Sequence, residues 1–212
     1  PAAANGHEHG IELVAAQALQ LAQDLHGDGA LAGNDVRIVE RRHQCGAAFR
    51  RQSHRDLLAA LADDRVTSVD VVDALAPVIE WHEAGLVPLG ESLGQEPRCH
   101  LKLGDFFGWF DTPRAPGDRY DVVLLDIDHS PRALLHPEHA RFYAEPGLRR
   151  LREGIAAGGV FAMWSDEGPD EAFIAVLEAV FVNIRAEVVA FDNPLTGGAS
   201  ACTIYVAGPE AG

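Results

Sequence analysis

Hydrophobic and polar positions follow two different periods along this chain. Short apolar runs typical of buried strands occupy residues 35–39, 66–72, 98–103, 120–126, 160–164, 184–191 and 201–207. Between them, apolar residues recur at helical spacing over residues 11–25, 55–62, 77–83, 137–153 and 171–181. This alternation predicts an α/β fold with a mostly parallel sheet. The last two strands follow each other without a helix, which predicts one antiparallel strand.

The most informative run is residues 120–131, an apolar segment that ends in Asp126 and Asp128 and is stopped by Pro131. A continuous apolar run indicates a strand buried on both faces, and ligands of open α/β sheets bind beyond the carboxyl ends of such strands. If the strand geometry continues to Asp128, both carboxylates point to the same face. These acids are therefore candidates for chemistry, and the alternative is that they only cap the loop.

Length and composition predict one domain over residues 11–208, preceded by a flexible N-terminus at residues 1–10. No apolar stretch approaches the roughly 20 residues that span a bilayer, so we expect a soluble cytoplasmic protein. The formal net charge of −15 argues against nucleic acid or an anionic membrane as partner and is compatible with a cationic small molecule. The sequence leaves both a monomer and a homodimer as alternatives.

The three cysteines and the remaining histidines suggest no other chemistry. Cys45, Cys99 and Cys202 are widely separated, so we expect reduced, buried thiols. His136 and His139 are three residues apart without a further ligand, which favours solvent-facing histidines over a zinc site. Adjacent side chains diverge, so the run from Asp128 to Ser130 is no hydrolase triad, and phosphate-binding glycine loops are absent from the sequence.

Several segments together resemble the spermidine synthase (polyamine aminopropyltransferase) family of the methyltransferase-like superfamily. They are Val71-Val72-Asp73 with residues 78–81, residues 98–107 with Gly104-Asp105-Phe106, residues 120–131, Phe142-Tyr143, and residues 158–161. The similarity covers residues 66–207, about two thirds of the chain. It implies a three-layer Rossmann-like methyltransferase fold with a seven-stranded sheet. It also implies transfer of an aminopropyl group from decarboxylated S-adenosylmethionine to a small amine such as putrescine, without a metal.

The resemblance assigns a role to each candidate residue. Asp73, after the second strand, would bind the ribose hydroxyls, and Asp105 with the Phe106 backbone would hold the adenine edge. Asp126 would be the catalytic carboxylate, which orients the attacking amine and accepts its proton. Asp128 would steady a second ammonium, and Tyr143 would line the amine pocket. Structural alternatives stay open: an acid at a helix N-terminus for Asp73, a turn acid for Asp105 and a core aromatic for Tyr143.

The chain also departs from the family. The glycine-rich turn expected after the first strand is replaced by residues 40–54, where only Gly46 remains and several arginines would repel a sulfonium. The family commonly has a longer spacing between its two acids, and His129 occupies a position without an assigned role. An S-adenosylmethionine-dependent methyltransferase and a non-catalytic relative with a disrupted cofactor loop are therefore the alternatives to an aminopropyltransferase.

Overall fold

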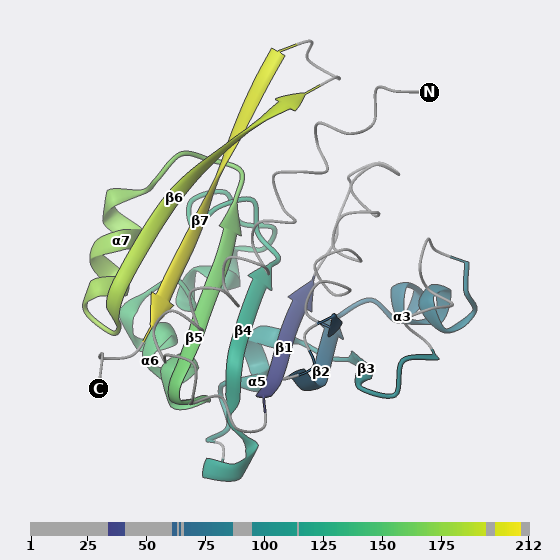
Figure 1. Cartoon of the computed structure of the whole chain (residues 1–212). Coiled ribbons are helices and arrows are strands. Elements are labelled where there is room, and N and C mark those ends of the chain that lie inside the picture. The colour runs from purple at the N-terminus through teal and green to yellow at the C-terminus, as the bar shows by residue number, and fades with distance from the viewer. Residues whose placement is uncertain are drawn as a thin grey trace.

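The computed structural model describes residues 34–40, 61–62, 64, 66–86, 95–113, 115–193 and 198–208 (Figure 1). Three sequence predictions lie outside this part of the chain: the flexible N-terminus, the helix over residues 11–25 and most of the helix over residues 55–62. The loop that lacks the glycine-rich turn is also outside it, apart from Glu40 at the end of the first strand.

The described strands form one seven-stranded sheet in the order β3-β2-β1-β4-β5-β7-β6. They are β1 (Asn34–Glu40), β2 (Val66–Asp73), β3 (Cys99–Leu103), β4 (Tyr120–Asp126), β5 (Ile155–Ser165), β6 (Val182–Asn193) and β7 (Gly198–Gly208). The first five strands are parallel, and β7 runs antiparallel to both β5 and β6. From β1 to β3 successive strands are added on one side of β1, and from β4 onward they are added on its other side. Open α/β sheets bind ligands at such a switch point, here between β1 and β4.

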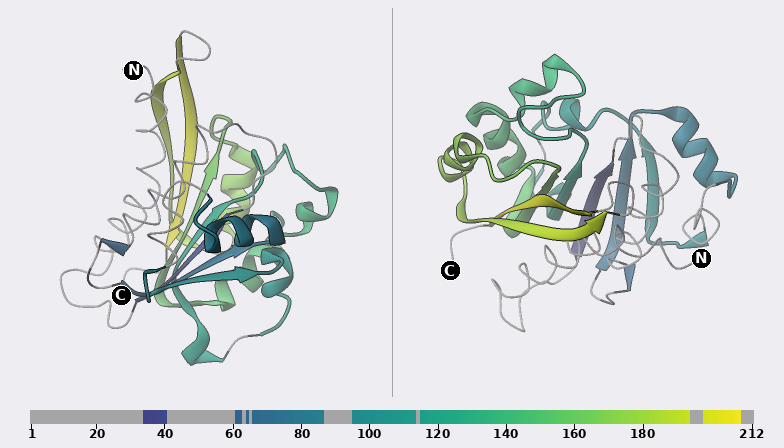
Figure 2. Two further views of the ribbon diagram at one scale, coloured as in Figure 1. Left: turned by 90° about the vertical axis from the view of Figure 1, so that its right-hand side faces the viewer. Right: turned by 90° about the horizontal axis from the view of Figure 1, so that it is seen from above.

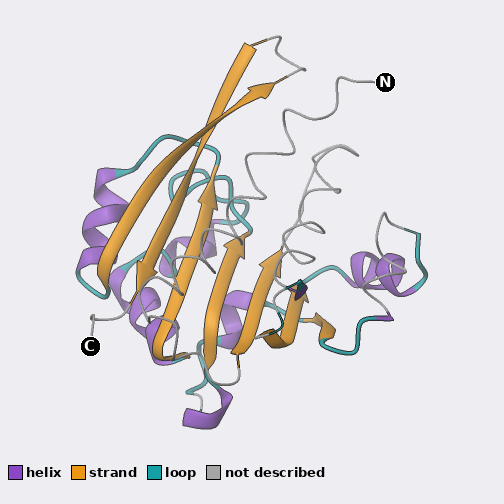
Figure 3. Cartoon of the chain, viewed as in Figure 1, coloured by secondary structure: helices purple, strands orange, loops and turns teal. Residues whose placement is uncertain are grey.

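Helices cover one face of this sheet. They are α5 (Phe106–Trp109), α6 (Glu145–Glu153) and α7 (Glu171–Glu178), while α3 (Ala76–Glu83) contacts β2 and β3. One hydrophobic core joins α5, α6 and α7 to β4, β5 and β7. Figure 2 shows the helices on one side of the sheet, and Figure 3 shows α6 and α7 beside β5 and β6. The described residues thus supply the sheet and one helical layer of the three-layer arrangement expected from the sequence.

The helix predicted over residues 137–153 is wrong in its continuity. A short 3-10 helix covers Pro137–Arg141, and α6 starts only at Glu145. Pro146 is the physical cause, because proline lacks the N–H that would bond to the Phe142 carbonyl and is tolerated only in the first turn of a helix. The N-cap residue Ala144 is extended, with ψ 159°.

Strand β5 starts five residues earlier than the sequence pattern indicated. Tyr120 pairs with Ile155 and Val122 with Val160, so β5 bulges between these two pairs. Gly158 has φ 86° in this bulge, a conformation that favours glycine. A Cβ on Gly159 would lie 2.7 Å from the Asp121 carbonyl oxygen. The two glycines therefore lie within β5 and allow it to bulge where it pairs with β4.

Candidate functional site at the carboxyl ends of the strands

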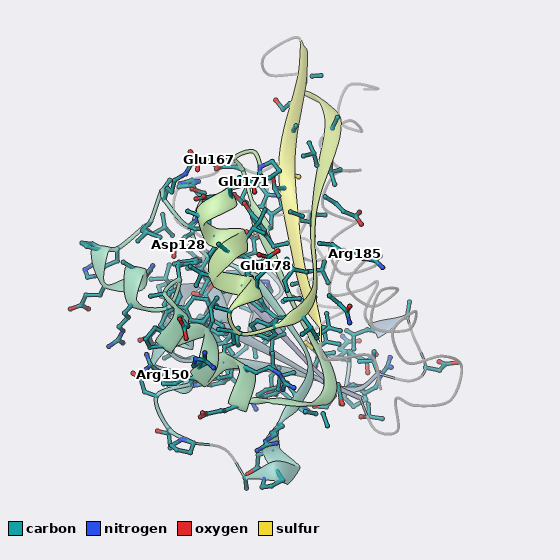
Figure 4. The ribbon with its side chains drawn as sticks, turned by 90° about the vertical axis from the view of Figure 1, so that its left-hand side faces the viewer. Asp128, Arg150, Glu167, Glu171, Glu178 and Arg185 are labelled. Atoms are coloured by element: carbon teal, nitrogen blue, oxygen red, sulfur yellow. The ribbon has the colours of Figure 1, made fainter. Side chains whose placement is uncertain are left out.

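The carboxyl ends of the parallel strands carry acidic residues. β2 ends at Asp73, β4 at Asp126 and β1 at Glu40; Asp105 and Asp166 lie just beyond β3 and β5. Because the five strands are parallel, these ends lie along one edge of the sheet. Figure 4 labels Asp128 and Glu167, from the loops after β4 and β5, toward this edge, with Arg150 toward the other end.

Asp73 and Asp105 lie at adjoining strand ends. The Gly104 N–H donates to the Asp73 carbonyl oxygen at 2.9 Å, which links the ends of β2 and β3. Asp73 is buried, and its Oδ1 accepts a hydrogen bond from the Leu75 N–H at 2.7 Å. This contact orders the turn into α3, whose N-cap residue is Leu75. The structure therefore gives Asp73 a local structural contact, and its role toward a ribose stays a prediction.

Asp105 is exposed and caps the short helix α5, where its Oδ1 accepts from the Phe107 N–H at 3.1 Å. The Phe106 side chain is buried in an aromatic cluster, with ring centroids 5.2 Å from Phe110 and 5.4 Å from Phe142. This packing leaves only the Phe106 backbone for the predicted adenine contact. A Cβ on Gly104 would lie 3.2 Å from the Trp109 indole nitrogen, so Gly104 makes room for that ring.

The two acids of the β4 loop occupy different environments. Strand β4 ends at Asp126, so the strand geometry does not continue to Asp128. Asp126 is half-buried, whereas Asp128 is buried with its side chain fully covered. The strand geometry on which a shared face of the two carboxylates depended therefore ends before Asp128, and of the two only Asp126 is partly exposed.

The Asp128 carboxylate is the centre of a buried hydrogen-bond network. Its Oδ1 accepts from the Leu135 N–H at 2.6 Å and lies 2.8 Å from the His139 Nδ1. Its Oδ2 accepts from the Tyr143 hydroxyl at 2.9 Å. Burial and the neighbouring Asp128 carboxylate raise the pKa of Tyr143 well above its ordinary value. The two residues predicted to face the amine thus lie together, with their polar atoms bonded to each other inside the protein.

The expectation of a solvent-facing histidine holds for His136 and is wrong for His139. His139 is only 6% exposed, because its ring bonds to Asp128 and lies 4.1 Å, between ring centroids, from Phe107. His136 remains exposed. Within the described ranges, no three histidine, cysteine, aspartate or glutamate side chains are grouped so as to hold a metal ion. Of the cysteines described, Cys202 is buried and Cys99 half-buried, and both are free thiols.

A histidine–aspartate pair at this edge was not predicted. The His129 Nδ1 lies 3.0 Å from the Asp166 Oδ2, and the Asp166 N–H donates to the His129 carbonyl oxygen at 2.8 Å. The pair joins the loop after β4 to the loop after β5. The rule that selected Asp126, an acid directly after a buried parallel strand, also applies to Asp166 after β5 and would have found it.

Solved structures similar to this chain include spermidine synthases and methyltransferases. Spermidine synthase from Thermotoga maritima has a TM-score of 0.60 at 14% sequence identity, over 95% of this chain and 60% of that one. A probable spermidine synthase from Corynebacterium glutamicum has a TM-score of 0.57 at 17% identity, over 95% and 63% of the two chains. Human methyltransferase-like protein 13, in complex with SAH, has a TM-score of 0.61 at 17% identity, over 96% and 82%.

These likenesses concern the fold. No family model matches the chain. The chain spans about 60% of the length of the T. maritima spermidine synthase. No helix in the described part of the chain is both long and apolar enough to cross a membrane. With its strand order, its antiparallel β7 and these structural neighbours, the chain has a methyltransferase-like α/β fold.

Proposed function

We propose that this chain is a transferase that uses an adenosyl sulfonium donor, and specifically an aminopropyltransferase. It would move the aminopropyl group of decarboxylated S-adenosylmethionine to a small amine such as putrescine. The observation that carries this proposal is the acidic carboxyl edge, where four of the five parallel strands end within two residues of an aspartate. Both a sulfonium donor and an ammonium acceptor are cations, and carboxylates favour cations nearby.

The reaction is an in-line displacement that needs orientation and removal of one proton. The amine nitrogen bonds to the carbon beside the sulfur, the carbon–sulfur bond breaks, and its electron pair stays on sulfur as a thioether. An ammonium must first lose a proton to expose its lone pair. Asp126 is suited to orient the amine and to accept this proton, because it is half-buried at the end of β4 beside the switch point of the sheet.

The remaining candidate residues divide into a group that would bind the adenosyl donor and a group that would support the amine. Asp73, Asp105 and the Phe106 backbone would bind the adenosyl group at the ends of β2 and β3. Carboxylates there suit a ligand with hydroxyl and amino donors. Asp128 and Tyr143 would support the amine side by fixing the loop that follows Asp126, since their own polar atoms bond to each other.

Calorimetric titration with three adenosyl compounds tests the proposal. We expect decarboxylated S-adenosylmethionine and methylthioadenosine to bind at least about tenfold more tightly than S-adenosylmethionine, a difference of about 1.4 kcal/mol. A preference for S-adenosylmethionine would instead support a methyltransferase, the second candidate, which the likeness to the human methyltransferase-like protein favours. A folded sample that binds none of the three would contradict both enzymes and favour a non-catalytic relative.

Replacing Asp126 tests the catalytic assignment. We expect Asp126→Asn to lower kcat by at least about 100-fold, because a neutral amide can neither hold the ammonium by charge nor accept its proton. Affinity for methylthioadenosine should stay within about twofold of wild type, since the change leaves β2 and β3 untouched. Glu178→Gln, an exposed change on α7, is the control and should leave both values unaltered. Undiminished turnover of Asp126→Asn would remove Asp126 from the mechanism.

A further inference from the structure

The last residue of β4 and the third residue of the loop after it both keep part of their side chains exposed. Ile127 and Asp128 are buried, at 7% and 3% exposure, whereas Asp126 is half-buried and His129 exposed. Asp126 and His129 are three residues apart, so their Cα atoms lie at most about 11 Å from each other. Both residues therefore lie at the same edge of the sheet, where the proposed function places the amine.

Asp166 orients the His129 ring from the next loop. The side-chain contact of 3.0 Å is accompanied by a backbone hydrogen bond of 2.8 Å between the same two residues. A carboxylate only accepts hydrogen bonds, so the Nδ1 carries the hydrogen and the Nε2 of the neutral ring is an acceptor. With the side chain 47% exposed, this second nitrogen can meet a ligand.

The position of Asp166 is itself constrained by its neighbours. The Glu167 N–H donates to the Ser165 hydroxyl at 3.3 Å, and the Thr203 hydroxyl donates to the Glu167 carbonyl oxygen at 2.7 Å. Arg132, from the β4 loop, forms ion pairs with Glu167 and Asp170. Arg132 thus joins the two loops a second time, on the C-terminal side of the His129–Asp166 pair, which limits the freedom of the imidazole ring.

We propose that His129 is a second catalytic residue of this site, with Asp166 as its positioning residue. The inference rests on the proposed function and divides the task given there to Asp126. Asp126 holds and orients the acceptor ammonium, and the His129 Nε2 takes its proton. The amine nitrogen then bonds to the carbon beside sulfur, and the carbon–sulfur electron pair remains on sulfur. Imidazole is a stronger base than a carboxylate, so it removes an ammonium proton at smaller cost.

Chemical rescue tests this role. We expect His129→Ala to lower kcat for aminopropyl transfer by about 100-fold with KM for the donor within about twofold of wild type. Because the site is exposed, added imidazole should restore kcat about tenfold, which a structural role would not allow. Asp166→Asn should lower kcat by about tenfold, since its amide oxygen still accepts from Nδ1 while the charge is lost.

His136→Gln is the matched control, because His136 is an exposed histidine of the same loop. Its Nδ1 contacts Glu138, and its ring lies 5.8 Å, between ring centroids, from His139. The variant should keep wild-type kcat and show no response to imidazole. The inference would be overturned if His129→Ala kept the wild-type kcat, or if imidazole did not restore the lost kcat. The proposed function would still stand in either case, provided that the wild-type protein transfers the aminopropyl group. A wild type that transfers no group from either donor would overturn both.

Discussion

The Asp128 carboxylate fixes the loop after β4 from inside the protein. Its three donors come from Leu135, His139 and Tyr143, so one carboxylate bonds to residues up to 15 positions farther along the chain. A buried carboxylate is stable only when donors replace the water that it has lost. Asp126 directly precedes this loop and His129 lies in it, so the network helps to set where these two residues stand. Under the mechanism proposed above, the same network would serve both stability and function.

Tyr143→Phe should lower the free energy of unfolding by about 2 kcal/mol, because a buried carboxylate loses one hydrogen-bond donor. The substitution should also change the response to alkali. The pKa of Tyr143 is raised in the folded protein by burial, then by Asp128. Its contribution is therefore fully present below the ordinary tyrosine pKa of about 10 and is lost as the pH rises above it.

Urea unfolding between about pH 8 and pH 11 checks this prediction. Wild type should lose stability with rising pH more steeply than Tyr143→Phe. Part of the slope will remain, because burial also raises the pKa of Tyr205. Equal slopes for the two proteins would show that Tyr143 ionises in the folded state as easily as in the unfolded one.

Residue positions in this loop could be predicted only in part. The apolar run and its terminal acids predicted that Asp126 lies at the end of a strand, and the structure confirms this position. The inward turn at Asp128 depends on His139 and Tyr143, whose side chains are brought to it from 11 and 15 residues away. Such contacts leave no periodic signal in the sequence, so the burial of His139 could not be predicted.

At the scale of elements, strands were easier to predict than helices. A buried parallel strand is a continuous apolar run, so β2 and β4 were found within one residue of their observed bounds. The broken helix over residues 137–153 was missed because helical spacing continues through Pro146 while the backbone does not. The bulge in β5 was missed because its glycines precede the apolar run of residues 160–164 that predicted the strand.

Gly147 shows how tightly the 3-10 helix and α6 are packed. A Cβ at this position would lie 2.4 Å from the carbonyl oxygens of both Arg141 and Phe142. These are backbone atoms, so they cannot move away by a change of rotamer. We expect Gly147→Ala to lower the free energy of unfolding by about 2 to 3 kcal/mol, despite the better helix propensity of alanine.

Gly117→Ala is the control for this prediction, since no atom lies within 4 Å of a Cβ built there. It should leave the urea midpoint within the error of measurement. If Gly147→Ala were equally neutral, the turn between the two helical segments would have to relax without any loss of stability. Turnover is a separate readout, and it should fall in Gly147→Ala if the substitution displaces the loop that carries His129.

At the scale of the whole molecule, the alternation of elements was sufficient to predict the α/β architecture. Parallel strands need crossover connections, and this places the first five carboxyl ends on one edge. What the pattern could not supply is which loops meet there. The pairing of His129 with Asp166 follows from β4 and β5 being neighbours in the sheet, a fact of strand order rather than of local sequence.

The net charge of the molecule leads to the last prediction. The chain has 32 acidic and 17 basic side chains besides histidine, a formal net charge of −15. Such an excess of one sign destabilises a compact state through self-repulsion. Salt should therefore stabilise this protein: from about 0.01 M to about 1 M the screening length falls from about 30 Å to about 3 Å.

We expect the free energy of unfolding to rise by about 1 kcal/mol over this range, measured by urea unfolding in NaCl and in KCl. Equal effects of the two salts would indicate screening rather than binding of a particular cation. Exposed ion pairs such as Arg149 with Glu145 oppose the trend, but each contributes only about 0.5 kcal/mol. A stability that falls with salt would mean that paired charges outweigh the acidic excess. If the aspartates at the carboxyl edge are among these paired charges, the edge would attract a cationic donor less strongly than unpaired aspartates would.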